Sequence, residues 1–345
     1  MAVRPEISVI VVAYGRRDFI AEALDSVAFQ DLDPASFEVV VCTNLPGVNL
    51  GSWANDSRVT LLHFSSGNWG EWILAALPRC RGEILCFLDD DDRFEPTKLS
   101  CVRSAFERYP KVGYFHNRVQ RVSQSSSGSD GWGGPEIRAA PEGPGIGLFE
   151  NRRKNRGRID RLFWSGGGFN ASAMAVRREV VQSLGPLASQ LEMGHPLALF
   201  FAAALGSWDL YFEPTALTRY RVHSANSSVP LGSDVRTEFR RAVERGDAVV
   251  RDSERIAQFI DSHGRGRVTS TAVRSVGART RLLRSLNLPD LSRTLLLRGL
   301  VEYLSLTPPR IVADQGGMLA AVAFGLFSPR RAARWLRVGR GATAP

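Results

Sequence analysis

Four consecutive aspartates, Asp89 to Asp92, are the residues of this 345-residue chain that most directly suggest chemistry. They follow the unbroken apolar run Ile84 to Leu88, which has the composition of a buried strand. Adjacent carboxylates repel one another, so four of them at the end of such a strand favour a bound cation. Mg²⁺ and Mn²⁺ prefer oxygen ligands and accept phosphate oxygens as well, which predicts a metal ion that binds a nucleotide diphosphate.

The acidic run is expected to present its carboxylates on two faces. Side chains alternate along an extended strand, so Asp89 and Asp91 are predicted on one face and Asp90 and Asp92 on the other. The alternative is a solvated acidic turn that caps a helix beginning near Pro96, a role that Asp92 can take in either case. We favour the metal site because acidic turns seldom follow directly on a strand without polar residues.

The elements that would position these carboxylates alternate between strand and helix over the first hundred residues. Strand patterns cover 7–13, 37–42, 59–64 and 84–88, and helical patterns cover 18–29, 71–77 and 97–109. This alternation predicts an α/β fold with a mostly parallel central sheet flanked by helices. Ligands bind at the carboxyl ends of parallel strands, so Tyr14, the turn Cys42 to Asn44 and the aspartates are expected to converge.

The pattern changes beyond residue 110. A strand is predicted over 112–122, and the stretch 123–147, rich in Ser, Gly and Pro, is predicted to be a flexible loop, either filler or a lid. Three glycines, Gly166 to Gly168, indicate backbone close to a ligand or a plain turn. From residue 232 onward the pattern is helical and rich in arginine, so we predict a domain over 1–231 and a C-terminal α-helical region over 232–345.

Composition narrows the classes of partner. A net charge of +9 favours anionic partners such as nucleotide sugars, lipid headgroups or nucleic acid. Nucleic acid is disfavoured as a partner because the basic residues do not interleave with an aromatic platform. A nicotinamide-dependent dehydrogenase is disfavoured because the first βα turn lacks the glycine fingerprint of dinucleotide-binding folds. Four cysteines without metal-ligand spacing, and an N-terminus without a signal-peptide pattern, predict a cytoplasmic protein.

Several motifs resemble, in the right order, those of the inverting family-2 glycosyltransferases with the GT-A fold. The matching segments are Ile7 to Tyr14, Gly67 to Gly70, Arg81 to Asp92, Gly167 to Arg178 and Tyr220 to His223. The resemblance covers about residues 5–228, and the acidic signature in its strand context is its specific part. It implies transfer of a sugar from a UDP-, GDP- or dTDP-linked donor to a hydroxyl of a saccharide or lipid-linked acceptor.

The resemblance also implies roles for individual residues. The implied donor-binding residues are Val12, Ala13, Tyr14, Arg16, Thr43, Asn44, Asn68, Asp89, Asp90 and Arg221. The implied metal ligands are Asp91 and His223, and the implied acceptor-side residues are Trp164, Gly167 and Gly168. The ion would be Mn²⁺ or Mg²⁺, which neutralises the leaving diphosphate as a Lewis acid. For His223 an ordinary packed or solvent-facing histidine is the alternative.

Two positions depart from the family pattern. A carboxylate usually follows the second strand, where this chain has Thr43 and Asn44, so these two would recognise the base. An acidic pair that usually supplies the general base is also absent, which leaves His195 and Glu192 as candidates and Asp160 as an outside alternative. Each could equally be a helix-start residue, and the departures motivate a second hypothesis, a degenerate GT-A protein that acts as a nucleotide-sugar sensor or scaffold.

The C-terminal region raises the question of a membrane. An amphipathic helix is predicted over 232–260, and the apolar stretch 311–327 is too short for a bilayer span. The basic segment Ser328 to Arg337 either lies on an anionic membrane surface or packs as a helix with its arginines in water. Membrane binding would favour a lipid-linked sugar or a surface polysaccharide as acceptor, at the inner face of the cell membrane.

Overall fold

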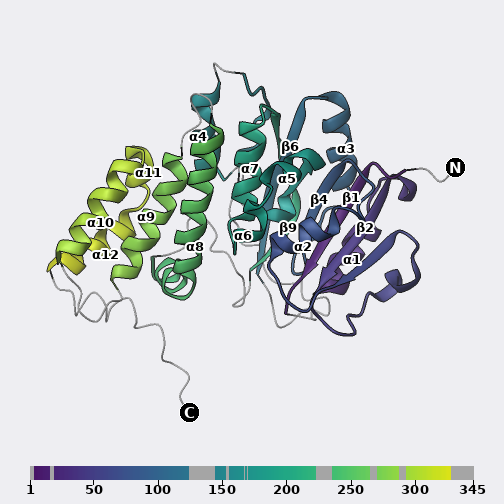
Figure 1. Cartoon of the computed structure of the whole chain (residues 1–345), viewed down its shortest axis with the longest axis horizontal. Coiled ribbons are helices and arrows are strands. Elements are labelled where there is room, and N and C mark those ends of the chain that lie inside the picture. The colour runs from purple at the N-terminus through teal and green to yellow at the C-terminus, as the bar shows by residue number, and fades with distance from the viewer. Residues whose placement is uncertain are drawn as a thin grey trace, which may run out of the picture. The chain divides into compact units, whose positions relative to one another are not determined.

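A computed structural model of the chain describes residues 4–15, 19–123, 144–152, 155–166, 168, 170–222, 235–264, 270–286 and 293–327. The chain divides into two units (Figure 1). The first unit comprises Met1–Leu191, His195–Ala225 and Arg265–Val268, and the second comprises Glu192–Gly194, Asn226–Gly264 and Thr269–Pro345. Most of the predicted loop 123–147 and the basic segment 328–337 lie outside the described residues.

Nine strands in the described part of the first unit form one mixed sheet. They are β1 (Ile7–Ala13), β2 (Phe37–Thr43), β3 (Val59–His63), β4 (Ile84–Asp89), β5 (Arg93–Phe94), β6 (Val112–Ser123), β7 (Gly147–Phe149), β8 (Met174–Arg177) and β9 (Asp209–Val222). Their order is β3-β2-β1-β4-β8-β6-β9-β5, with β7 paired to β9. Strands β1 to β4 pair in parallel, as do β6 and β9, whereas β8 runs antiparallel between β4 and β6. The predicted α/β fold is confirmed.

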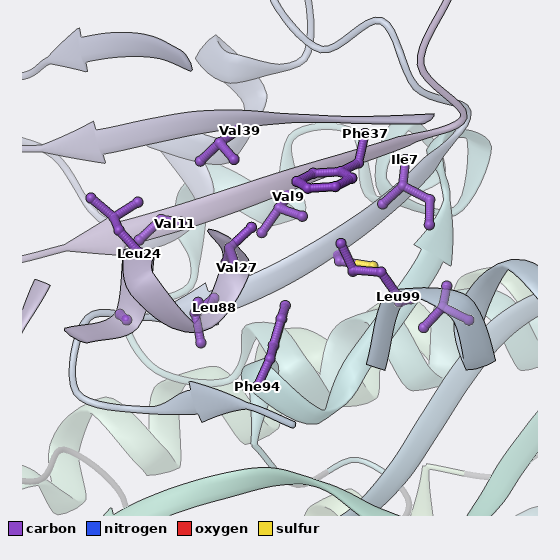
Figure 2. Close-up of a cluster of buried hydrophobic side chains, with 14 of the residues drawn as sticks. Ile7, Val9, Val11, Leu24, Val27, Phe37, Val39, Leu88, Phe94 and Leu99 are labelled. Carbon is purple, nitrogen blue, oxygen red and sulfur yellow. The ribbon is translucent and has the colours of Figure 1, made fainter. Parts of the chain in front are cut away.

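The core beneath the sheet fixes the strand that carries the aspartates. Ile7, Val9 and Val11 of β1 share one face, because side chains alternate along a strand, and they pack against α1 (Ile20–Ala28) and α3 (Lys98–Arg108) (Figure 2). Helix α1 buries Leu24 and Val27 on its apolar stripe. Strands β1 and β2 are buried along their whole length, which explains their continuous apolar composition.

Helices α2 (Trp69–Ala76), α4 (Ile159–Trp164), α5 (Arg178–Leu184), α6 (Leu187–Gln190) and α7 (His195–Leu205) complete the first unit. Helix α6 packs against α2 and α5, and α5 packs against α7 (Figure 1). The predicted helices over 18–29, 71–77 and 97–109 correspond to α1, α2 and α3.

Strand β9 was not predicted from the sequence, although it is the longest strand among the described residues. Pro214 and several charged residues interrupt its apolar pattern. The structure accommodates them with a register shift, since Asn117 of β6 pairs with Glu213 while Arg118 pairs with Ala216. Such a bulge allows a proline within a paired strand, because the proline needs no ladder hydrogen bond there.

The described part of the second unit beyond residue 234 is helical, as predicted. It contains α8 (Val235–His263), α9 (Thr271–Ser285), α10 (Arg293–Leu306), α11 (Pro309–Ala313) and α12 (Gly316–Phe327). Helix α9 packs against α8 and α10, and α12 packs against α10, around a core that includes Leu282, Leu296 and Tyr303. Within the described residues, no helix combines the length and the apolar character needed to cross a membrane.

Candidate active site

A tight turn at the end of β4 gathers three of the four aspartates. The backbone N–H of Asp92 donates to the carbonyl of Asp89 at 3.1 Å, which reverses the chain directly after the strand. Asp89, Asp91 and Asp92 each offer a carboxylate oxygen, and these oxygens lie within 4.8 Å of one another. We call these three residues the acidic cluster. The predicted alternation over two faces is therefore wrong, because the extended strand ends at Asp89.

Burial makes the acidic cluster electrostatically costly. Asp91 and Asp92 are almost fully buried. Burial raises the pKa of Asp92 well above its usual range, and the charges of Asp91 and Asp89 raise it further. A hard divalent cation with oxygen ligands would relieve this repulsion. The donor set of three carboxylates therefore fits Mn²⁺ or Mg²⁺.

The segment before β8 supports the acidic cluster from the neighbouring strand. The hydroxyl oxygen of Ser172 accepts the backbone N–H of Asp89 at 3.0 Å, and Asn170 Nδ2 donates to Asp92 Oδ2 at 3.2 Å. Asn170 holds a backbone φ of +62°, a conformation that asparagine tolerates better than most residues. Its Oδ1 is buried and has no hydrogen-bond partner among the described residues.

A buried polar chain continues from Ser172 into the protein. The Thr218 hydroxyl donates to the Ser172 carbonyl at 3.0 Å, and Asn117 Nδ2 donates to Thr218 Oγ1 at 3.0 Å. Lys98 Nζ donates to Asn117 Oδ1 and, at 3.1 Å, to the Ala173 carbonyl. Complete burial lowers the pKa of Lys98 to about 7. We call these side chains the Lys98 network. No sequence pattern predicted it, because a lysine in the first turn of a helix normally faces water.

Arg221 braces the acidic cluster from inside the fold. Its side chain is 1% exposed, and its guanidinium donates to Glu22 and, at 3.1 Å, to the Asp91 carbonyl. The guanidinium carbon also lies 4.1 Å from the centre of the Phe19 ring. The backbone N–H of Arg221 donates to Asp92 Oδ1 at 3.1 Å. These contacts give Arg221 a structural role, which corrects the implied contact of its guanidinium with the donor diphosphate.

An exposed aromatic residue marks the end of β1. Tyr14 is 59% exposed and its ring centroid lies 5.4 Å from that of buried Trp72, which in turn stacks on Phe64 at 5.1 Å. The two preceding residues, Val12 and Ala13, are buried within β1, and the Val12 carbonyl accepts the Asp90 N–H at 3.1 Å. Tyr14 directly follows β1, the strand that pairs with β4. Its exposed ring can therefore stack on a planar nucleobase.

The two residues expected to recognise the base differ in accessibility. Thr43 is fully buried, and its hydroxyl oxygen accepts the Leu45 N–H at 3.0 Å, so it cannot contact a ligand in this conformation. Asn44 is half-buried, and its Oδ1 accepts the Gly15 N–H at 3.0 Å. Gly15 has a φ of +72°, which a glycine adopts without strain. Asn44 thus ties the β1 turn to the end of β2.

Asn68 acts as the N-cap of α2. Its Oδ1 accepts the Glu71 N–H at 3.0 Å, the Glu71 carboxylate accepts the Asn68 N–H at 3.0 Å, and its Nδ2 donates to the Ser189 carbonyl at 2.7 Å. This reciprocal pair is a capping box, which satisfies N–H groups at the helix start. Both polar atoms of the Asn68 side chain are therefore engaged by the protein, which favours a helix-capping role over the implied donor contact.

His195 is part of the interior, contrary to its predicted role as general base. It is 2% exposed, and Nε2 lies 3.1 Å from the Gly70 N–H nitrogen and 3.2 Å from the Ala188 carbonyl oxygen. Its ring centroid lies 5.0 Å from that of Trp69. Burial lowers the pKa of His195 to about 4, so the ring is neutral and shielded at neutral pH. A base must reach the acceptor hydroxyl, which this histidine cannot do here.

Glu192 belongs to the second unit, where its side chain is 44% exposed and forms an ion pair with Arg251 at 2.8 Å. Its backbone N–H, with those of Met193 and Gly194, donates to the carboxylate of Asp252 at 2.7 to 3.1 Å. Glu192 is therefore an accessible carboxylate on a segment that Asp252 fixes.

The remaining implied residues lie around α4 and α7 or outside the described part of the chain. Asp160 is in the first turn of α4, and Trp164 ends that helix with its ring 4.8 Å from that of Phe163. Gly168 faces α7, since a Cβ there would lie 3.2 Å from Leu197 Cδ1. Arg16, Gly167 and His223 lie outside the described residues.

The mixed sheet, with clustered carboxylates after a central strand, defines a GT-A-like α/β fold. Residues 8–185 match glycosyl transferase family 2, and this match covers just over half of the chain. The chain belongs to this family, which confirms the resemblance seen in its motifs. It is thus an enzyme that transfers a sugar from a nucleotide-sugar donor. No match was found among curated proteins.

Solved structures of glycosyltransferases share the fold. TarS 1–349 from S. aureus aligns with a TM-score of 0.56 at 14% identity, covering 98% of this chain and 93% of that chain. The complex of TarS 1–349 with UDP-GlcNAc aligns with a TM-score of 0.52 at 16% identity, covering 96% of this chain and 89% of that chain. The mannosyltransferase PcManGT from Pyrobaculum calidifontis, in complex with GDP-Man and Mn²⁺, aligns with a TM-score of 0.52 at 18% identity. The alignment covers 96% of this chain and 85% of that chain.

Proposed function

We propose that this protein is a metal-dependent inverting glycosyltransferase that uses a nucleoside diphosphate sugar as donor. The acidic cluster carries the proposal, because three carboxylate oxygens converge within 4.8 Å at the end of β4. Asp89, Asp91 and Asp92 would hold Mn²⁺ or Mg²⁺, and the ion supplies Lewis-acid neutralisation of the leaving diphosphate. PcManGT, bound to GDP-Man and Mn²⁺, supports the choice of ion and of donor class.

The donor's nucleoside is assigned to the exposed end of β1. Tyr14 offers an accessible ring face that is backed by Trp72, so it can stack on a base without rearrangement. Asn44 is the accessible amide beside this turn, whereas buried Thr43 is not carried forward. Asp90, the aspartate outside the acidic cluster, is only 2% exposed, so it is not proposed as a ribose-side residue. The donor is UDP-, GDP- or dTDP-linked, and His223 is retained as an additional ligand.

The general base is assigned to Glu192, since His195 is buried and neutral. An inverting displacement requires removal of the proton from the acceptor hydroxyl, and an accessible carboxylate can take it. The exposed ion pair of Glu192 with Arg251 is weak enough to exchange. Glu192→Gln should lower kcat at least 100-fold with donor binding unchanged, whereas Glu254→Gln, which removes another ion-paired carboxylate of the same unit, should not.

The acceptor is a saccharide or a lipid-linked sugar of cell-surface polysaccharide or glycolipid synthesis, with the enzyme at the inner face of the cell membrane. The strongly basic composition supports an anionic surface as its place of work.

A degenerate GT-A protein that senses nucleotide sugars is the second candidate. The buried position of His195, where the family places an acidic residue, favours it. The two candidates differ in turnover: both should bind donor, but only the enzyme should release the diphosphate.

Calorimetric titration of UDP, GDP and dTDP, with and without Mn²⁺, tests the proposal directly. The sugar donors of the best binder are then assayed for diphosphate release. Metal-dependent binding with turnover supports the transferase, and binding without turnover with any acceptor supports the sensor. Equal binding with and without Mn²⁺ would remove the metal assignment.

A further inference from the structure

The positive charge of the chain is confined to its C-terminal third. Residues 232–345 hold 20 of the 44 basic residues, all of them arginine, and 10 of the 35 acidic residues. The excess there is +10, whereas residues 1–231, with 24 basic and 25 acidic residues, carry −1. A charge separated in this way attracts an anionic partner to the helical region and not to the donor-binding domain.

Helix α10 presents an apolar stripe to solvent within this basic region. Leu297, Val301 and Leu304 are 54%, 58% and 43% exposed. Their spacing of four and three residues places them on one face of the helix, which we call the α10 stripe. A neighbouring face of the helix buries Leu296 and Tyr303 in the core of the second unit. The stripe is therefore not required by the packing of the described helices.

Arginines flank the α10 stripe. The helical positions of Arg293 and Arg298 put one on each side of it, and both are exposed. Arg310 is exposed on α11, the next helix along the chain. Within the described part of the chain, no ion pair is formed by these three residues. By contrast, Arg281 and Arg284 of α9 pair with Glu302 and Asp247. Glu302 of α10 and Asp247 of α8 are thus paired with arginines of α9, whereas Arg293 and Arg298 beside the stripe are exposed and available to an anionic partner.

We propose that the α10 stripe docks on an anionic lipid bilayer. Exposed leucine and valine side chains on a helix that lies in the interface plane enter the boundary between headgroups and acyl chains, and flanking arginines contact lipid phosphates. The docking is independent of the donor site. The three residues of the stripe and the two arginines that flank it on α10 are distinct from the basic segment 328–337.

The test is co-sedimentation of the full-length protein with vesicles of phosphatidylglycerol and phosphatidylcholine, compared with vesicles of phosphatidylcholine alone. We expect binding to the anionic vesicles that weakens as salt is raised. The triple variant Leu297→Ser, Val301→Ser, Leu304→Ser should bind at least 10-fold more weakly. The double variant Arg293→Gln, Arg298→Gln should bind several-fold more weakly and lose part of the salt dependence.

Matched controls come from the first unit. Phe29 and Leu61 are 73% and 45% exposed, and their replacement by serine removes exposed apolar surface without touching α10. Phe29→Ser and Leu61→Ser should bind vesicles like the wild type, and unchanged UDP or GDP binding in every variant reports an intact fold. Unchanged vesicle binding in the triple variant would overturn the proposal. A lower solution mass of the triple variant than of the wild type, with unchanged vesicle binding, would show instead that the stripe binds a second copy.

Discussion

The hydroxyl oxygen of Ser172 accepts a hydrogen bond from the backbone N–H of Asp89 at 3.0 Å and joins the segment before β8 to the end of β4. The same hydroxyl lowers the pKa of the Asp92 carboxyl and so partly opposes the effect of burial. One small side chain therefore contacts both ends of the turn that forms the acidic cluster. Its carbonyl connects it to Thr218 of the Lys98 network.

Removal of the Ser172 hydroxyl should weaken metal binding without unfolding the protein. A typical hydrogen bond contributes about 1 kcal/mol, so Ser172→Ala should raise the Kd for Mn²⁺ roughly fivefold in a calorimetric titration. Ser183→Ala is the matched control, because the Ser183 hydroxyl donates to the Val180 carbonyl within its own helix, α5. An unchanged Kd in Ser172→Ala would show that the hydroxyl does not position the cluster.

Loss of one carboxylate from the acidic cluster should abolish stabilisation by metal. At 100 times its Kd, Mn²⁺ should stabilise the wild-type protein by about 2.7 kcal/mol, seen as a higher Tm than in EDTA. Asp91→Asn should lose this increase. Its metal-free Tm should equal or exceed that of the wild type, because the substitution removes a charge that repels Asp92. A full Mn²⁺-dependent increase in the variant would contradict the ligand assignment.

Substitution of Arg221 should affect stability more than donor affinity. Arg221→Gln breaks the buried contacts with Glu22 and the Asp91 carbonyl, and the expected loss in urea unfolding is about 3 kcal/mol. Arg219→Gln, on the same strand, removes an ion pair whose arginine is 45% exposed and should cost less than about 1 kcal/mol. Unchanged stability together with a tenfold higher donor KM would restore Arg221 as a donor ligand.

His195 should be replaceable in catalysis. The amide oxygen of His195→Gln can accept the Gly70 N–H in place of Nε2, so kcat should stay within about threefold of the wild type. The folded-state pKa of about 4 lies below the ordinary value of 6.5, so wild-type stability should fall as pH drops from 6.5 toward 4. The variant should lack that fall. A 100-fold loss of kcat in a folded variant would identify His195 as the base after all.

Buried Lys98 should make the folding stability of the protein depend on pH in the alkaline range. Its folded-state pKa of about 7 lies below the unfolded value near 10.4, so the folded state binds fewer protons. Wild-type stability should therefore rise between pH 7 and 9.5, on the order of 1–3 kcal/mol relative to Lys98→Met. Lys111→Met, at an exposed lysine, should show no such change. Parallel pH profiles for the wild type and Lys98→Met would contradict a buried, destabilised ammonium group.

The sequence alone determined the parts of this protein that follow from local patterns. Continuous apolar runs predicted β1, β2 and β4, and i, i+3, i+4 spacing predicted α1 and α3, since burial of a strand or a helix face leaves a regular trace in the chain. The acidic run after β4 predicted the place where the structure gathers three carboxylates.

The tertiary structure alone decided which aspartates meet and which residues are accessible. The turn after Asp89 grouped Asp92 with Asp89 and Asp91, and burial removed His195 and Thr43 from the candidates for contact with substrate. It also placed Lys98 inside the fold. Contacts of this kind join residues far apart in the chain, so neither spacing nor composition encodes them, and only the packed arrangement of β4, β8 and β9 with their helices determines them.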